Sequence, residues 1–158
     1  MNIFKYCDKG ASTAMLIIRL VLGIIFVVHG ADKVGHLAET VESLSVGVGL
    51  PPWLAFLICA VEFLGGLGLV LGLFARFAAL GIGMVMLGAV ITVHAQHGFF
   101  LQNHGYEYNL ALIGMAIAVI LAGAGPWSID NKFAALRESK LQRHSYQERV
   151  ENETKPAS

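Results

Sequence analysis

The chain has 158 residues, of which 56% are hydrophobic and 14% are charged, and its formal net charge at pH 7 is zero. A soluble domain carries roughly 25% charged residues, whereas residues 13–125 hold only eight Asp, Glu, Lys or Arg side chains. A surface this poor in charge excludes a soluble globular fold, and the balanced net charge argues against a nucleic-acid partner. The composition predicts an integral membrane protein that is surrounded by the lipid bilayer.

Four apolar segments are about as long as the roughly 20 residues that a helix needs to cross the hydrocarbon core. We therefore predict an all-α fold, a transmembrane four-helix bundle, with a domain at 12–130, an N-terminal segment at 1–11 and a polar, partly disordered tail at 131–158. The first apolar segment follows two lysines, but it is long and has no small-x-small cleavage site after it, so we expect a retained helix. The four predicted spans are residues 12–30, 53–74, 77–97 and 107–125.

The first connection, residues 31–52, is too long for a simple hairpin. Its apolar residues recur at steps of three and four, the spacing of one helix face. We predict a short amphipathic helix that lies at the outer membrane interface. The apolar positions are Val34, Leu37, Val41 and Leu44.

The segment "GPWSIDN" at 125–131 predicts the end of the fourth span and the start of a further helix. Either Ser128 or Asp130 is suited to cap that helix, because short oxygen-bearing side chains accept hydrogen bonds from free N–H groups. Phe133, Leu136 and Leu141 stand among charges in the tail and suggest a juxtamembrane helix. From Glu148 on, the polar composition predicts disorder.

Lysine and arginine are distributed unevenly among the connections, which predicts the orientation of the chain. The first connection holds only Lys33, and the third, "HGFFLQNHGY", holds none. We predict that both termini are cytoplasmic in a multi-pass protein of the bacterial cell (inner) membrane. The residues on the predicted inner side are Lys5, Lys9, Arg76, Lys132, Arg137, Lys140 and Arg143.

Two charges fall inside predicted spans, Arg19 in the first and Glu62 in the second. A charge at the centre of the bilayer costs about 2.5 to 3.5 kcal/mol on insertion scales. Each of the two lies ten residues, or about 15 Å, from the expected outer end of its helix. We predict that they face the bundle interior and form an ion pair. That pair would either lock two helices together or form the floor of a site.

Six further polar residues lie near the outer ends of the spans, where they could form one pocket. Donor groups beside an apolar groove suit a small hydrophobic molecule with oxygen acceptors, such as a quinone. We predict no metal site, because the chain has neither a His-x-x-x-His nor a Glu-x-x-His pair. Solvated helix ends are the alternative explanation for any single histidine. The six residues are His29, Lys33, His94, His97, Glu107 and Asn109.

Four motifs occur in an order that resembles the DoxX family of small four-helix membrane proteins. The resemblance covers about residues 14–131. It implies a redox association, since some members belong to membrane thiosulfate:quinone oxidoreductases and others are described as oxidoreductases of quinone, catechol or thiol stress, or as membrane partners of detoxifying enzymes. It supplies no covalent cofactor motif. The motifs are "RLVLGIIFVVHGADKV", "EFLGGLGLVLGLFARFAAL", "YEYNLAL" and "GAGPWSID".

Together these observations suggest a quinone-linked membrane oxidoreductase, or its membrane subunit, acting in redox stress or sulfur-compound oxidation. The cofactor is unknown beyond a bound quinone as substrate, and a redox partner protein would supply electrons. The alternative is a non-catalytic membrane anchor or assembly partner, and a transporter would require a homo-oligomer. In the first interpretation the catalytic residues are Arg19, Glu62, His29 and Lys33, and the substrate-binding residues are His94, His97, Glu107 and Asn109.

Overall fold

The computed structural model describes residues 3–154, with side chains described for residues 10–149, and all regular elements within them are helices. The predicted all-α fold is confirmed. Short π- and 3₁₀-helical turns, labelled η, follow α4. The elements are α1 (Ile3–Gly35), α2 (Leu37–Gly47), α3 (Pro52–Leu71), α4 (Ala75–Ala89), η1 (Val90–His94), η2 (Ala95–His97), η3 (Leu101–Asn103), α5 (Glu107–Ala122) and α6 (Ile129–Thr154).

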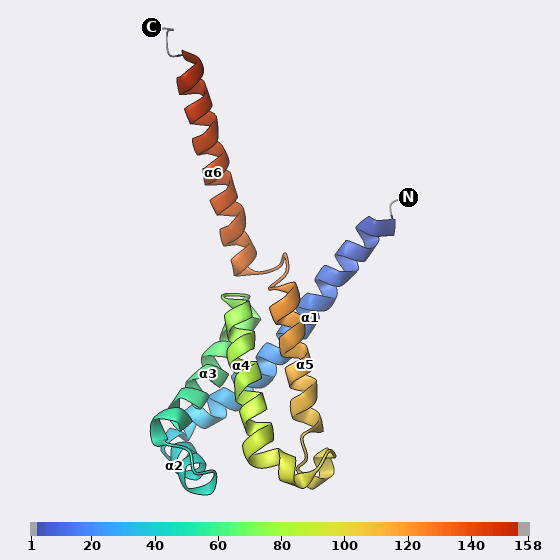
Figure 1. Cartoon of the computed structure of the whole chain (residues 1–158), viewed down its shortest axis with the longest axis vertical. Helices are drawn as coiled ribbons and strands as arrows, with labels where there is room; N and C mark the ends of the chain where they lie inside the picture. Colours follow the sequence, from blue (N-terminus) through green and yellow to red (C-terminus); the bar gives the residue numbers. More distant parts are fainter. Residues whose placement is uncertain (1–2, 155–158) are drawn as a thin grey trace.

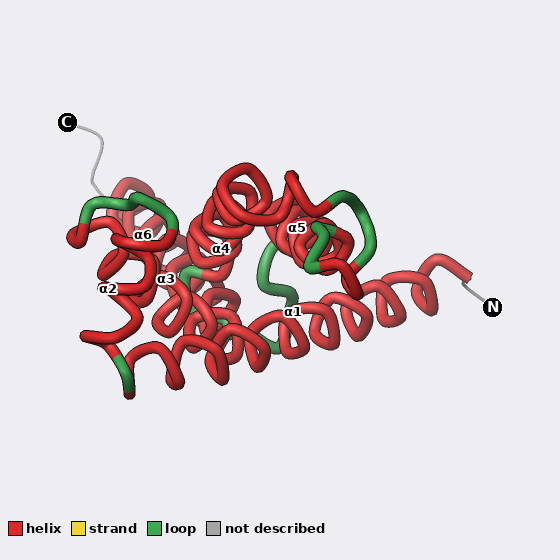
Figure 2. Tube along the Cα trace, turned by 90° about the horizontal axis from the view of Figure 1, so that it is seen from below, coloured by secondary structure: helices red, strands yellow, loops and turns green. Residues whose placement is uncertain are grey.

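Helices α1, α3, α4 and α5 form the bundle, in which α1 packs on α3 and α5, and α4 packs on the same two helices (Figure 2). The N- and C-terminal parts of the chain leave from one end of this bundle, which we call the termini end (Figure 1). Helix α2 and the connection between α4 and α5 lie at the opposite end, which we call the α2 end. The helix order and the direction of each helix agree with four antiparallel spans.

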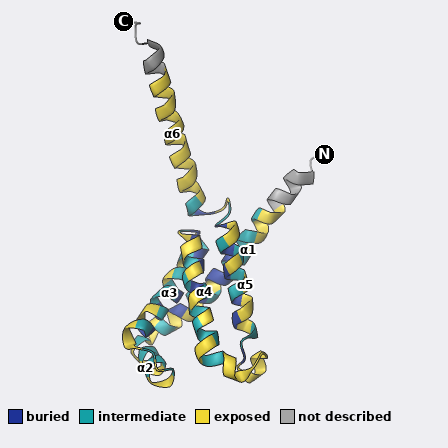
Figure 3. Ribbon diagram, in the orientation of Figure 1, coloured by how far each residue is buried: buried dark blue, intermediate teal, exposed yellow. Residues whose placement is uncertain are grey.

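Three helical segments are long and apolar enough to cross a membrane: Gly10–Gly35, Pro52–Leu71 and Ala75–His97. Helix α5 is also apolar but shorter, with 16 residues. Buried residues are concentrated inside the bundle, whereas its outer surface exposes large apolar side chains such as Leu64 and Leu121 (Figure 3). An apolar outer surface is what lipid requires, so the chain is an integral membrane protein.

The first predicted span ends too early, because α1 continues to Gly35 rather than stopping at residue 30. Lys33 therefore belongs to the spanning helix and not to the connection. The predicted short helix in the first connection is present as α2. All side chains of α2 are at least partly exposed, and the helix lies against α3.

Helices α1 and α3 approach each other so closely that their backbones touch. A Cβ atom added to Gly30 would lie 2.5 Å from the Phe63 nitrogen, and one added to Gly66 would lie 2.6 Å from the Val27 nitrogen. Such contacts are typical of small residues between helices in membranes, where van der Waals packing replaces the hydrophobic effect. These glycines fix how far α3 is shifted along α1.

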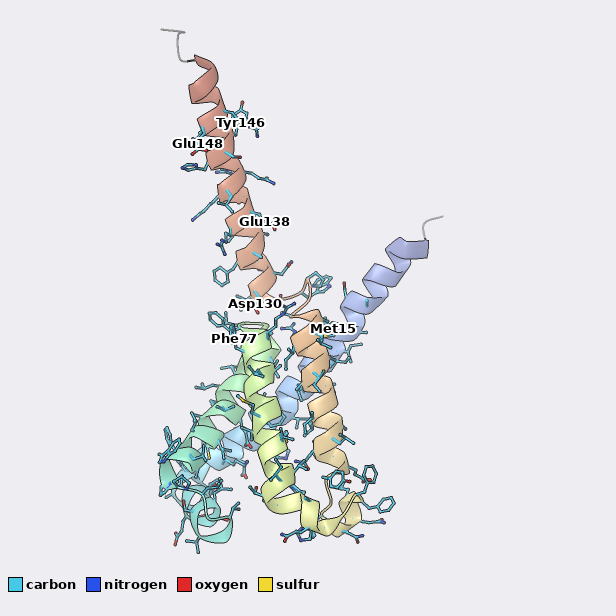
Figure 4. All side chains as sticks on the ribbon, viewed as in Figure 1. Met15, Phe77, Asp130, Glu138, Tyr146 and Glu148 are labelled. Atoms are coloured by element: carbon cyan, nitrogen blue, oxygen red, sulfur yellow. The ribbon has the colours of Figure 1, made fainter. Side chains whose placement is uncertain are left out.

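The junction between α5 and α6 uses both of the predicted capping residues. Ser128 Oγ accepts a hydrogen bond from the Asn131 N–H (3.2 Å) and caps α6. Asp130 instead accepts hydrogen bonds from the Phe74 and Ala75 N–H groups (2.8 and 3.0 Å) at the start of α4. Figure 4 shows Asp130 at this junction, near Phe77 of α4. The beginning of α6 is thereby attached to the bundle.

Beyond this junction α6 projects away from the bundle, and the side chains of residues 131–149 are exposed (Figures 1 and 4). The helix continues through Thr154, past Glu148, where the sequence predicts the start of disorder. Residues 155–158 lie outside the described residues. The charged surface of α6 explains why it does not enter the apolar bundle.

We expect Gly30→Ala to destabilise the protein by about 1–3 kcal/mol, because the new methyl group overlaps the backbone of α3 and forces the helices apart. Alanine ordinarily stabilises a helix relative to glycine, so the sign of the effect is diagnostic. Gly114→Ala in α5 is the control, since its added Cβ meets no atom within 4 Å. Thermal unfolding in detergent should show a lower midpoint for Gly30→Ala only. Equal midpoints for the two variants would contradict the close α1–α3 contact.

Candidate functional site

The buried carboxylate of Glu62 forms an ion pair with Lys33. Glu62 is only 2% exposed, and the Lys33 ammonium donates a hydrogen bond of 2.7 Å to its Oε1 atom. The other carboxylate oxygen of Glu62, Oε2, is also within ion-pair distance of the Lys33 ammonium, at 2.5 Å. Removing a carboxylate from water costs several kcal/mol, and a close opposite charge offsets that cost. The pair joins α1 to α3 in the half of the bundle nearer the α2 end.

The predicted pairing of Arg19 with Glu62 is wrong, although both side chains are buried in the bundle as expected. The guanidinium of Arg19 donates hydrogen bonds to the carbonyl oxygens of Leu69 (2.9 Å) and Trp127 (2.8 Å). A third, longer contact of 3.4 Å reaches the Val70 carbonyl. Arg19 and Glu62 therefore do not form a common charged floor.

The register between α1 and α3 explains this difference. Gly23 lies against Val70, and Gly30 lies against Phe63. The same antiparallel register puts Glu62 opposite Ala31, and Arg19 is twelve residues, or about 18 Å, nearer the termini end. The predicted depth of Arg19 in the membrane was counted from His29 as the outer end of the first span, whereas α1 continues to Gly35.

Arg19 instead caps the carboxyl end of α3. The carbonyls of Leu69 and Val70 are among the last four of that helix, whose carbonyls lack the usual i+4 donor inside the helix. The Leu69 carbonyl also accepts a hydrogen bond from the Gly72 N–H (3.2 Å). By also binding the Trp127 carbonyl, Arg19 connects α1, the end of α3 and the loop before α6. Gly72, in a left-handed conformation with φ of +67°, leaves the space that the guanidinium occupies. The contacts of Arg19 are those of a structural residue.

A cavity of about 580 Å³ lies beside the Lys33–Glu62 pair and is bounded mainly by α2, α3 and α4. Most of its lining is aliphatic side chains and methionine. The five polar side chains on its wall come from four elements, α1, α3, η1 and α5, and include four of the predicted site residues. These polar residues are Lys33, Glu62, Thr92, His94 and Asn109.

Asn109 and His94 bring two further elements to this cavity. Asn109, 6% exposed near the start of α5, places its Nδ2 atom 3.6 Å from the sulfur of Met86. His94 ends the π-helical turn η1, and its Nδ1 atom lies 2.6 Å from the carbonyl oxygen of His104. The cavity thus combines a few hydrogen-bonding side chains with a mainly apolar lining.

Three other predicted site residues do not line this cavity. The rings of His29 and His97 are exposed and bond the carbonyl four residues earlier in the chain, Ile25 and Val93, each at 2.9 Å. Glu107 is half-buried at the start of α5 and lies outside the lining. The six polar residues that were predicted to form one pocket are therefore divided: three line the cavity, and three lie outside it.

The sequence reasoning missed the methionines of the cavity wall, Met84 and Met86, together with the π-helical turn that places His94. It also missed the partner of Glu62. The available signal for that partner was the set of glycines in the first two spans, Gly23, Gly30 and Gly66, whose spacing indicates how α1 and α3 pack.

A double-mutant cycle distinguishes the two pairings. Lys33→Met and Glu62→Gln should show a coupling of about 0.5–3 kcal/mol in unfolding free energy, because these side chains touch. Arg19→Met and Glu62→Gln should be additive to within about 0.5 kcal/mol, since the two sites are far apart. Unfolding in mixed detergent micelles measures all three single and both double variants. Strong coupling of Arg19 to Glu62 would contradict the described ion pair.

Comparison with known proteins supports the family resemblance. The DoxX family model matches residues 14–95. A Bacillus subtilis protein named "Putative oxidoreductase CatD" is 31% identical over 112 residues, which is 71% of this chain and 82% of the relative. Two Escherichia coli K12 proteins are each 26% identical: "Inner membrane protein YqjF", over 77% of this chain and 93% of its own length, and "Inner membrane protein YphA", over 84% and 100%.

No solved structure matches the chain significantly. The family match nevertheless covers α1 from residue 14 on and all of α2, α3, α4 and η1, and so includes both members of the Lys33–Glu62 pair and His94. The curated relatives are covered over most of their length. The chain belongs to the DoxX family of membrane proteins.

Proposed function

We propose that this DoxX protein is the quinone-binding membrane component of an oxidoreductase system, and that the quinone head binds in the cavity beside Lys33 and Glu62. The observation that carries the proposal is the cavity itself, about 580 Å³ of largely apolar space with polar groups on one wall. That volume and lining are typical of small-molecule sites. The word oxidoreductase in the name of the B. subtilis relative agrees with this role.

The polar wall offers donors for the oxygens of a quinone head. An ammonium group has three N–H donors, and Glu62 has two oxygens near it, so Lys33 keeps at least one donor for a ligand. The paired carboxylate holds that ammonium in place beside the cavity. Asn109 adds an amide whose contact with a methionine sulfur is weak and easily exchanged for a ligand oxygen.

The cavity also reaches the outer surface of the bundle that faces lipid. Leu57 of α3 and Met84 of α4 line the cavity and are 47% and 60% exposed. A membrane-soluble ligand can therefore enter sideways between these two helices, with its apolar tail remaining in the bilayer. Leu44 of α2 and Val48, the residue just after α2, cover the same space.

Electron supply belongs to a partner protein in this proposal. The sequence has two cysteines, Cys7 and Cys59, 52 positions apart, and neither a C-x-x-C nor a C-x-x-C-H motif. The cavity binds and orients the quinone, and the partner exchanges electrons with it.

The exposed helix α6 favours a second function, that of an anchor or assembly partner for another protein. Its 26 residues project from the bundle, and the charged side chains of residues 131–149 are free to contact a partner. An anchor of this kind needs no ligand in the cavity. A variant with a blocked cavity that still supports assembly but binds no quinone separates the two functions.

Blocking the cavity mouth should abolish quinone binding. We expect Met84→Trp to weaken the affinity for a short-chain naphthoquinone at least about tenfold, because the larger side chain would fill the cavity mouth. A tenfold loss of affinity corresponds to about 1.4 kcal/mol of binding free energy. Titration of the purified protein in lipid nanodiscs measures this affinity. Leu87→Trp is the matched control, since Leu87 lies one turn away on α4, is 53% exposed and does not line the cavity. Unchanged binding by a folded Met84→Trp variant would refute the site.

For the orientation, we propose that the termini end is cytoplasmic and that the cavity lies in the outer half of the membrane. The lysine and arginine distribution supports this. Green fluorescent protein fused after Ser158 should fluoresce, because it folds on the cytoplasmic side. Alkaline phosphatase inserted after Gln102 should be active, because it folds on the outer side. The opposite pair of results would reverse the topology.

A further inference from the structure

The hydrogen bond between His94 and His104 fixes which nitrogen of the His94 ring carries hydrogen. The Nδ1 atom of His94 lies 2.6 Å from the His104 carbonyl oxygen. A carbonyl oxygen can only accept, so Nδ1 must be the donor. In a neutral imidazole the other ring nitrogen, Nε2, is then without hydrogen and acts as an acceptor.

The loop before α5 holds the His104 carbonyl in place. His104 has a left-handed backbone with φ of +61°, a conformation that a residue other than glycine adopts only when its surroundings impose it. Hydrogen bonds from the Tyr106 N–H to the Gly98 carbonyl (3.1 Å) and from the Glu107 N–H to the Phe99 carbonyl (2.9 Å) close the loop. The acceptor for His94 is therefore built into a rigid turn.

The π-helical turn brings His94 to the cavity. Four of the cavity-lining residues in α4 and η1 follow each other at steps of four and three, as on one face of an α-helix. They are Gly81, Val85, Gly88 and Thr92. Continued as an α-helix, the chain would place His94 on another face. The wider turn of η1, in which the Ala95 N–H reaches back to the Val90 carbonyl, shifts His94 to the cavity wall. Such π-turns occur frequently at functional sites.

We infer that His94 is a hydrogen-bond acceptor of this cavity for a ligand, in addition to the Glu62 carboxylate that is paired with Lys33, and that the cavity prefers a ligand carrying a hydroxyl group, the reduced hydroquinone, over one carrying only acceptor oxygens. The inference rests on the proposed function. A hydroquinone can donate one O–H to Nε2 of His94 while its other oxygen accepts from Lys33. An oxidised quinone has only lone pairs to place against Nε2.

The preference is measurable with two ligands that differ in their donors. We choose 1,4-naphthohydroquinone, kept reduced under anaerobic conditions, and its dimethyl ether, which keeps both oxygens but has no O–H. A site built to bond a hydroxyl discriminates strongly against an analogue that lacks it. We expect the wild-type protein in nanodiscs to bind the hydroquinone at least about tenfold more tightly, a difference equivalent to about 1.4 kcal/mol.

His94→Leu should remove this preference, and His29→Leu should retain it. His29 is the matched control, because its Nδ1 also bonds a backbone carbonyl while its ring lies outside the cavity. His94→Leu removes the acceptor nitrogen and leaves an apolar side chain at this position, so a loss of preference in this variant and not in His29→Leu reports the hydrogen bond. As a second measurement, the ¹⁵N shift of His94 Nε2 in the wild-type protein should move on addition of the hydroquinone and not of the ether.

The outcomes separate this inference from the proposed function. If neither ligand nor the short-chain naphthoquinone binds the wild-type protein, the proposed function fails. If both ligands bind equally, or if the hydroquinone leaves the His94 resonance unchanged, the inference fails and the quinone site stands. A preference that persists in His94→Leu assigns the acceptor to another residue and also overturns the inference.

Discussion

The close approach of α1 and α3 is the constraint on which the rest of the structure depends. Gly23, Gly30 and Gly66 let the two backbones touch, and that contact permits only one register. The register in turn decides which polar groups can meet across the interface. It brings Lys33 of α1 to Glu62 of α3, and it leaves Arg19 beside the carboxyl end of α3. Packing of small residues thus determines the electrostatics of the bundle.

The two charged side chains that are buried in the described part of the bundle, Arg19 and Glu62, have different kinds of partner. Arg19 donates hydrogen bonds to backbone carbonyls at the carboxyl end of α3 and in the loop before α6, so its charge and the end of α3 stabilise each other. Glu62 is satisfied by a lysine that is itself 31% exposed at the side chain and lies on the cavity wall. A ligand in the cavity could therefore contact Lys33 and Glu62 without breaking the hydrogen bonds that Arg19 makes at the end of α3.

The sequence was sufficient for the fold, because hydropathy and caps act locally. The four apolar segments, the helix α2, the Ser128 cap of α6 and the burial of Arg19 and Glu62 follow from such patterns. The bond of Asp130 to the start of α4 and the end of α1 at Gly35 do not. The partners of the buried charges did not follow, since they depend on the register and on where α1 ends. The rotation of each helix is equally nonlocal, which is why Lys33, Glu62, His94 and Asn109 line the cavity while His29 and His97 lie outside it. A π-helical turn changes that rotation and leaves no trace in the hydropathy.

The irregular backbone segments at the two ends of the bundle are also held in different ways. At the termini end, the left-handed residues Gly72 and Phe74 are held by Arg19, Ser128 and Asp130, whose side chains fill the space around them. At the α2 end, the π-turn and the loop around His104 are held mainly by backbone hydrogen bonds. In membranes, irregular backbone persists only where protein buries it or where it lines a cavity. At the termini end the irregular backbone is covered by protein, and at the α2 end the π-turn lines the cavity through His94. At the termini end, Arg19, Ser128 and Asp130 make hydrogen bonds that close the fold, whereas at the α2 end Lys33, Glu62 and His94 line the cavity in which we propose that the quinone binds.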